Sequence, residues 1–388
     1  MTAAAGWLPV PPNKMMKDIR LNWLFFVVLV AGIAARLFVA TLGHNYDMES
    51  WQIAMQTPVT GNVYPTTFRY NYAPGWFFVM HGLYFLAGDN PVRFRYALAG
   101  FLTLVDAGTF FILWRKFGKL AGCWFFLSPI SVILTGYQSN FDNLAVFVAL
   151  LAAFLIKDEF DQPVSRQTVL GLVVLGLSLV LKHIFFAFPF WLAVKQRGIG
   201  QKFIVVLIPV SMFFLSFVPY WHGGKEGIMQ NVFLYKSYTT EFFYNMFLPR
   251  FVQFMFSSKG IWFFCLALFA FVYRKKSVVE SLLLYTCVMI AISPAIMNEY
   301  MAIPLCFVAT HLNVFTVLYT IYGSVHELVD YNGLRLAWIS SKNCIDVAIY
   351  MLFPALIWVS WREEIIDAGK RLMKWASFEI ENQLGLKK

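Results

Sequence analysis

Charged residues are scarce in this sequence. Asp, Glu, Lys and Arg make up only 13% of its 388 residues, whereas soluble domains carry about 25%. Hydrophobic residues account for 59% of the chain and aromatic residues for 19%. Half the usual charge on so apolar a chain excludes an ordinary soluble protein and indicates burial in lipid.

The alternating strands of a membrane β-barrel, about ten residues each, are also missing. Instead, many stretches approach the about 20 apolar residues (range ~17–25) that a transmembrane helix needs. We therefore expect an all-α polytopic membrane protein in which residues 1–388 form a single transmembrane domain.

Cysteine motifs and internal repeats are absent as well. The five cysteines show no CxxC or Cys/His spacing, so the sequence supports neither a disulfide framework nor a zinc site. No internal repeat is visible in the sequence, and this argues against the two-fold architecture of many transporters.

Basic residues give the chain a net charge of +10. They cluster in short connections between apolar segments, at residues 14–20, 115–119, 195–202 and 274–276. Cytoplasmic loops of membrane proteins carry such clusters. The excess charge therefore reports topology, and we expect no nucleic-acid partner.

These clusters orient the chain. Residues 1–21 are expected in the cytoplasm, and the apolar run 22–43 is too long for a signal-peptide core and lacks a cleavage site. This first helix delivers HNYDMESW, residues 44–51, to the outside. The next apolar stretch, 74–88, is short for a span, and laying it along the outer surface keeps the cluster 115–119 inside. We thus expect a long first external loop, residues 44–94, that carries surface helices.

The same reasoning places the later helices. They are expected at residues 95–114, 120–136, 141–156, 167–181, 184–194, 203–221, 277–295 and 345–360, with one more that ends at residues 273–276. Residues 300–323 form either one long helix or a hairpin of two short ones. Residues 361–388 are typical of an amphipathic surface helix, which its Lys and Arg place at the cytoplasmic face.

Polar residues from distant parts of the chain share the outer membrane boundary in this topology. They are Asp47, Glu49, Asn140, Asp142, Asn143, Lys182, His183 and Glu299. Alone, each is ordinarily a helix cap, a solvated loop charge or a snorkelling side chain. Ionisable groups near lipid are costly and mark functional sites, so their convergence on one face predicts a shared site.

The chemistry that suits such a site is substitution at an activated, membrane-held donor. A carboxylate there suits deprotonation of an acceptor hydroxyl, and Lys182 with His183 suits neutralisation of a phosphate leaving group. The aromatic loop 62–76 suits stacking against a sugar or, equally, an interfacial aromatic belt.

Four short motifs follow one another along the chain. They are Asp47-Met48-Glu49 with Trp51 nearby, Asn71-Tyr72-Ala73-Pro74, Leu181-Lys182-His183-Ile184, and Asn298-Glu299. In this order the chain resembles the GT-C fold glycosyltransferases. It is most similar to the dolichyl-phosphate-glucose-dependent glucosyltransferases of N-glycan assembly, and the loop 62–78 also resembles uncharacterised bacterial membrane glycosyltransferases.

The resemblance implies a GT-C-like bundle of about 10–12 transmembrane helices. It implies inverting transfer of a hexose from a polyprenyl-phosphate donor to a glycan or lipid-linked acceptor on the non-cytoplasmic face. Asp47 would be the catalytic base, with Glu49 as its substitute or orienting partner, and Lys182 and His183 would bind the donor phosphate. The sugar or acceptor pocket is assigned to Asn140, Asp142, Asn143, Glu299, Tyr72 and Trp51.

The chain departs from those glucosyltransferases at two motif positions. Asn71 stands where they carry an acid, and Asn298 where they carry a His. The chain is also shorter than the eukaryotic enzymes. The two substitutions bear on the glucose donor and the N-glycan acceptor and leave the reaction class unchanged. The shorter length favours a bacterial or archaeal cell membrane, or the ER membrane if the source is eukaryotic.

Two further expectations concern alternatives. A transporter or flippase for a lipid-linked or small polar solute is the alternative function, and a non-catalytic membrane scaffold is a third. No metal or other cofactor is expected, although Asp47 and Glu49 are able to hold a divalent ion through oxygen.

Overall fold

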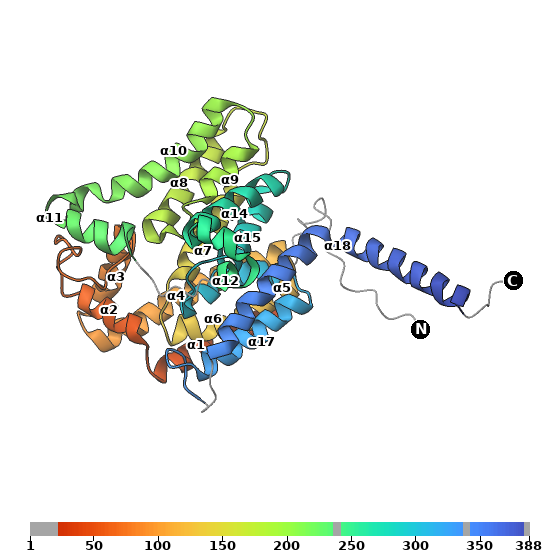
Figure 1. Cartoon of the computed structure of the whole chain (residues 1–388). Helices are drawn as coiled ribbons and strands as arrows, with labels where there is room; N and C mark the ends of the chain where they lie inside the picture. Colours follow the sequence, from red (N-terminus) through yellow and green to blue (C-terminus); the bar gives the residue numbers. More distant parts are fainter. Residues whose placement is uncertain (1–21, 236–241, 337–341, 384–388) are drawn as a thin grey trace.

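The computed structural model describes residues 22–235, 242–336 and 342–383. The cytoplasmic segment expected at residues 1–21 and the last residues of the C-terminal segment, 384–388, lie outside this range. Throughout the described residues the chain is helical and forms no strand, as Figure 1 shows.

Several helices are long and apolar enough to cross a membrane singly. These are α1 (Trp23–Thr41), α4 (Pro91–Lys116), α10 (Ile199–Ser216) and the part Asn343–Asp367 of α18 (Lys342–Gln383). Shorter apolar helices are α7 (Asp142–Leu155), α8 (Arg166–Leu181), α9 (Phe188–Lys195), α14 (Ser258–Val272), α15 (Val278–Ala291) and α17 (Val314–Val329). The all-α polytopic membrane fold is thereby confirmed, whereas the count of crossings stays a prediction.

The helix expected at 120–136 is in fact two. α5 (Lys119–Leu127) and α6 (Pro129–Gly136) meet at Ser128 with a bend of 48°. Pro129 lacks an N–H group and disfavours helical dihedrals at the residue before it, so the first helix ends there and the second begins on the proline.

The segment 44–94 contains α2 (Tyr46–Ala54), α3 (Pro74–Leu86) and the start of α4. α2 begins at Asn45, whose side chain accepts from the Asp47 N–H, and α3 begins with a proline. The Tyr70 hydroxyl donates to the Ala73 carbonyl at 2.7 Å and accepts from the Phe77 N–H at 2.9 Å. The loop is therefore packed around its own aromatic residues. Its location outside the membrane stays a prediction.

Other boundaries also differ from the expected ones. The helix expected at 203–221 is α10 followed by α11 (Val218–Ile228), which is kinked at His222 and at Gly223, where φ is +82°. Short segments follow: η3 (Met229–Phe233), α12 (Phe242–Phe247) and α13 (Arg250–Met255). Between α8 and α9 lies η2 (His183–Phe185).

The ambiguous region 300–323 resolves into separate pieces. η4 (Asn298–Ala302) and α16 (Leu305–Thr310) precede α17, whose first turn is capped by Asn313, so a single long helix is excluded. α18 contains a non-helical residue at Trp361, where the amphipathic segment was expected to begin, and its C-terminal part projects away from the helical body (Figure 1).

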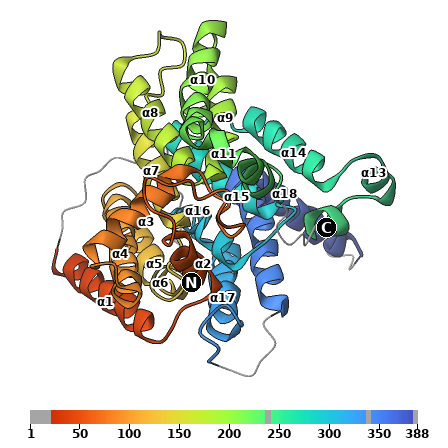
Figure 2. The same cartoon turned by 90° about the vertical axis from the view of Figure 1, so that its left-hand side faces the viewer.

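One side of the molecule gathers α2, α3 and α11. Both views place these three helices together, and Figure 2 shows them facing the reader. The Asn62 side chain donates to the Tyr220 carbonyl at 2.8 Å and so joins the 44–94 segment to α11. The candidate site is built against this segment.

Candidate functional site

A buried ion pair lies at the centre of the site. Lys182 Nζ is 2.6 Å from Asp142 Oδ2, and both side chains are buried. Asp142 is the first residue of α7 and Lys182 follows the last residue of α8. Because the two helices form a hairpin, the start of one and the end of the other meet, and sequence-distant charges become partners.

Three aromatic rings surround the Lys182 ammonium. The distances from Nζ to the ring centres are 4.9 Å for Phe141, 5.1 Å for Tyr72 and 6.0 Å for Tyr300. A cation within about 6 Å of an aromatic face is attracted by the ring quadrupole. The rings therefore add a favourable electrostatic contact to the one that Lys182 makes with Asp142.

Two further carboxylates approach this pair. Asp47, in the first turn of α2, and Glu299, in η4, are both partly exposed. Both acids interact electrostatically with Lys182 and Asp142. Glu299 also interacts with Asp47. The structure therefore brings Asp47, Asp142, Lys182 and Glu299 together.

Burial raises the pKa of both acids. For Asp47 the largest effect is loss of solvation, opposed by the positive charge of Lys182 and the Asn45 hydrogen bond. For Glu299 burial is again the largest effect, the charges of Asp47 and Asp142 add to it, Lys182 opposes it, and the pKa reaches about 8. One of the two acids is thus able to hold a proton at neutral pH while the other is ionised.

Tyr72 lies among these charges. Burial raises the pKa of its hydroxyl far above the ordinary value, and the charges of Asp47, Glu299 and Asp142 raise it further. The ring also contacts Phe141 at 4.8 Å between centroids. Tyr72 therefore remains a neutral wall of the site.

Glu49 is turned away from the group. Its side chain is 55% exposed and its Oε2 lies 3.8 Å from Arg69 NH1. Two residues along a helix correspond to about 200° of rotation, so Asp47 and Glu49 face opposite sides of α2. The expectation that Glu49 substitutes for Asp47 as the base is not supported by this geometry.

His183 also points elsewhere. Its side chain is exposed, and its ring contacts Phe213 of α10 at 6.1 Å between centroids. It follows Lys182 in sequence, but the aromatic contact of its ring is with α10 and not with the carboxyl groups of the site. The Lys-His motif therefore divides into one buried cation and one residue on the side of α10.

Three predicted pocket residues have internal roles. Asn140 accepts the Asp142 N–H at 3.2 Å, and Asn143 donates to Thr135 Oγ1 at 3.1 Å. Trp51 is 1% exposed and packs edge-on against Trp76 at 5.8 Å. These side chains support the walls of the site, because their surfaces are consumed by protein contacts.

Sequence reasoning missed other residues. Arg69 donates from Nε to the Tyr46 hydroxyl at 2.8 Å and acts on the charge of Asp47. Tyr300 and Phe141 complete the rings around Lys182. The last two adjoin Glu299 and Asp142 in sequence, which was the available signal, whereas nothing in the loop pattern singled out Arg69.

An apolar hollow of about 760 Å³ opens between α10, α11 and η3. Its lining residues are Phe214, Phe217, Val218, Trp221, His222, Met229 and Phe233. Phe213 contacts Phe217 and Phe233 on one side and His183 on the other. A continuous aromatic path thus leads from the hollow to the residue beside Lys182.

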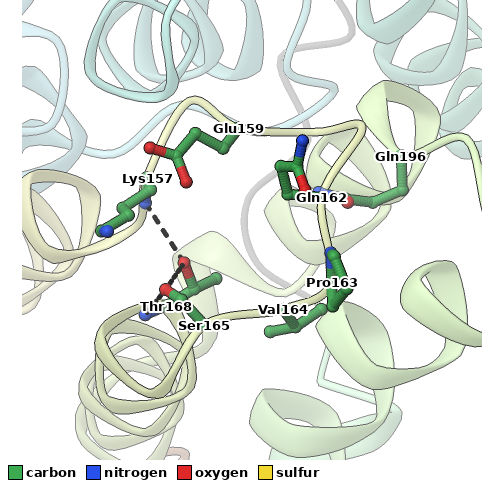
Figure 3. A pocket seen from close by; sticks show the side chains of 8 residues that line it. All are labelled: Lys157, Glu159, Gln162, Pro163, Val164, Ser165, Thr168 and Gln196. Atoms are coloured by element: carbon green, nitrogen blue, oxygen red, sulfur yellow. Dashed lines mark hydrogen bonds between the residues drawn. The ribbon is translucent and has the colours of Figure 1, made fainter.

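A second hollow lies at the connection between α7 and α8 (Figure 3). Its volume of about 10 Å³ is that of a single water. Within it, Thr168 Oγ1 accepts the Lys157 N–H at 3.3 Å and lies 3.1 Å from Ser165 Oγ. It is too small to be a substrate site.

Metal ligands do not assemble in the described part of the chain. Within residues 22–235, 242–336 and 342–383, no group of three or more His, Cys, Asp or Glu side chains is arranged to hold a metal ion. The pair Asp47 and Glu49, considered for this role from sequence, is separated by the turn of α2.

Comparisons with known proteins give one structural likeness. No protein-family model and no curated protein matches the sequence. The fold is similar to that in the crystal structure of ArnT from Cupriavidus metallidurans in the apo state, with 13% identity and a TM-score of 0.48 over 86% of this chain and 75% of that chain. A likeness at this level supports no conclusion about the activity of this chain.

Proposed function

We propose that this protein is an inverting glycosyltransferase that moves a hexose from a polyprenyl-phosphate donor to a glycan or lipid-linked acceptor at the non-cytoplasmic membrane face. The observation that carries the proposal is the buried Lys182–Asp142 pair, 2.6 Å between Nζ and Oδ2, with two partly exposed carboxyl groups beside it. The resemblance of the ordered motifs to GT-C glycosyltransferases supports the same reaction class.

Lys182 is assigned to the donor phosphate. An ammonium group has three N–H donors, and one of them is given to Asp142. The remaining donors serve a phosphate oxygen in a site of low dielectric constant, where charge-assisted bonds are strong. The phosphate leaves with the electron pair of the broken bond to the anomeric carbon, and Lys182 stabilises the negative charge that it gains.

Asp47 is assigned as the general base. Its carboxylate accepts the proton of the acceptor hydroxyl while that oxygen forms the new bond to the anomeric carbon. Glu299, whose pKa is raised to about 8 by burial and by the charge of Asp47, holds its proton at neutral pH and donates a hydrogen bond to the sugar. Unequal environments that separate two carboxyl pKa values are a recurrent way to assign acid and base roles.

The apolar hollow is assigned to the isoprenoid chain. Its aromatic lining and volume of about 760 Å³ suit a hydrocarbon chain. Such a chain is as apolar as the lipid that it leaves, so close packing against the aromatic rings is what stabilises it in the hollow. Ring contacts of Phe213 with Phe233 and with His183 join this hollow to the residue that follows Lys182 in sequence, and we assign the phosphate end of the lipid to the Lys182 ammonium. His183 then lies beside the first isoprene units. No metal takes part in the proposed reaction, and EDTA is expected to leave the transfer rate unchanged.

Transfer by the purified protein tests the proposal. A panel of polyprenyl-phosphate hexoses is incubated with the protein in lipid nanodiscs together with membrane glycolipid extracts, and release of polyprenyl phosphate is measured. Asp47→Asn is expected to abolish release without a change in thermal unfolding, while the matched Glu49→Gln variant retains it. Survival of transfer in Asp47→Asn would remove Asp47 as the base, and donor movement between leaflets without release would favour a flippase.

A further inference from the structure

A buried polar network joins four helices near the site and is not used by the proposed reaction. Arg36 of α1 and Asp106 of α4 are both fully buried, with Arg36 Nε 2.9 Å from Asp106 Oδ2. Arg36 also donates to the Phe126 carbonyl at 2.8 Å and to Ser131 Oγ at 2.6 Å. A charged pair at membrane depth is costly, and its retention calls for a function.

Thr135 of α6 connects this network to the site. Its hydroxyl donates to Asp106 Oδ2 at 2.6 Å and accepts from Asn143 Nδ2 at 3.1 Å. Asn143 is the neighbour of Asp142 in the first turn of α7, and all of these side chains are buried. Fixing Asn143 therefore fixes the rotation of the helix start that presents the Asp142 carboxylate.

The axial position of the ion pair is fixed separately. Ser178 Oγ of α8 donates to the Ala145 carbonyl of α7 at 2.9 Å. The two helices are antiparallel. Asp142, three residues before Ala145, and Lys182, four residues after Ser178, therefore lie at the same end of the hairpin. Rotation and axial position together place Asp142 against Lys182.

We infer that Thr135 is a positioning residue, which transmits the fixed location of the Arg36–Asp106 pair to Asp142 and thereby holds the Lys182 ammonium in place for an anionic ligand. The link consists of two hydrogen bonds through one hydroxyl, of 2.6 Å and 3.1 Å. The part that concerns the anion rests on the proposed function, whereas the part that concerns the ion pair does not.

Ser131 provides a matched control in the same helix. Its hydroxyl accepts from Arg36 and donates to Asp106 Oδ2 at 3.3 Å, yet none of its hydrogen bonds reaches α7. Loss of either hydroxyl removes a buried hydrogen bond from Asp106, but only loss of the Thr135 hydroxyl disconnects α7. Thr135→Val keeps the shape and removes the link, and Thr135→Ser keeps the hydroxyl.

Two readouts separate positioning from packing. The first is acylation of Lys182, which is only 4% exposed, measured by peptide mass spectrometry after treatment of the folded protein with an N-hydroxysuccinimide ester. The second is the Kd for farnesyl phosphate in detergent. Thr135→Val is expected to increase Lys182 acylation and to raise the Kd by about tenfold, the effect of losing roughly one buried hydrogen bond. Thr135→Ser and Ser131→Ala are expected to remain near wild type in both.

Each outcome decides a separate question. Equal effects of Thr135→Val and Ser131→Ala overturn the inference, because the network would then act only through packing. If wild type binds no farnesyl phosphate but the acylation contrast persists, the proposed phosphate role fails and the positioning role stands. Asn143→Ala breaks the same link from α7 and is measured alongside, so that poor folding of one variant leaves the test intact.

Discussion

Lys182 contributes both to the stability and to the proposed activity of the protein, and a double variant separates the two contributions. Lys182→Met leaves the buried Asp142 carboxylate unpaired, which costs about 3–5 kcal/mol of stability. It also removes the proposed phosphate donor, an effect of about 10²–10³ on turnover for loss of one such group. The double variant Lys182→Met/Asp142→Leu is expected to recover the unfolding temperature and not the activity. Recovery of both would show that Lys182 acts only through folding.

The two partly exposed acids predict a bell-shaped pH dependence. Burial raises the pKa of Asp47 and brings that of Glu299 to about 8. Activity is expected to rise with pH as Asp47 loses its proton and to fall as Glu299 loses the proton that it donates to the sugar. Glu299→Gln keeps a donor at every pH, so its kcat profile should lose the alkaline limb and retain the acidic one. An unchanged alkaline limb in this variant would assign that limb to another group.

At the scale of the helix, α6 approaches α1 so closely that there is no room for a side chain at the contact. A Cβ atom at Gly136 would lie 2.4 Å from the Arg36 carbonyl oxygen, whereas one at Gly100 of α4 meets nothing within 4 Å. Gly136→Ala is expected to lower stability by about 1–3 kcal/mol, as overpacking does. Gly100→Ala, the matched control, should raise it by about 0.5–1 kcal/mol because it restricts the unfolded chain. Thermal unfolding in detergent measures both, and equal shifts would contradict a tight α1–α6 contact.

Helices were easier to predict than the directions of their side chains. Apolar length and basic clusters located α1, α4, α7 and α8 closely, because burial in lipid demands long apolar segments. Pro129 is a sequence signal for the bend, although it lies within a continuous apolar run. The outward turn of Glu49 and the turn of His183 toward Phe213 depend on helix rotation and on partners far along the chain, which no local pattern encodes.

At the scale of the whole molecule, convergence of the site was predictable from sidedness alone. Asp47, Asp142, Lys182 and Glu299 were assigned to one membrane boundary by counting helices between basic loops, and they meet in the structure. Arg69 and the rings of Phe141 and Tyr300 were not assigned, because their role arises only when distant segments pack. Sidedness therefore identified the charged members of the site, and tertiary packing selected which of them face one another.

The predicted topology also places two surface acids on opposite sides of the membrane. Glu49, beside the site, and Glu159, in the connection between α7 and α8, are both exposed, and the positive-inside pattern assigns them to the outer and cytoplasmic faces. In intact cells, a membrane-impermeant maleimide is expected to label Glu49→Cys directly and Glu159→Cys only after permeabilisation. Peptide mass spectrometry at each position avoids confusion with the five native cysteines. Labelling of both in intact cells, or the reverse order, would invert the topology, and the proposed chemistry would then belong to the cytoplasmic face, where soluble nucleotide-sugar donors compete with lipid-linked ones.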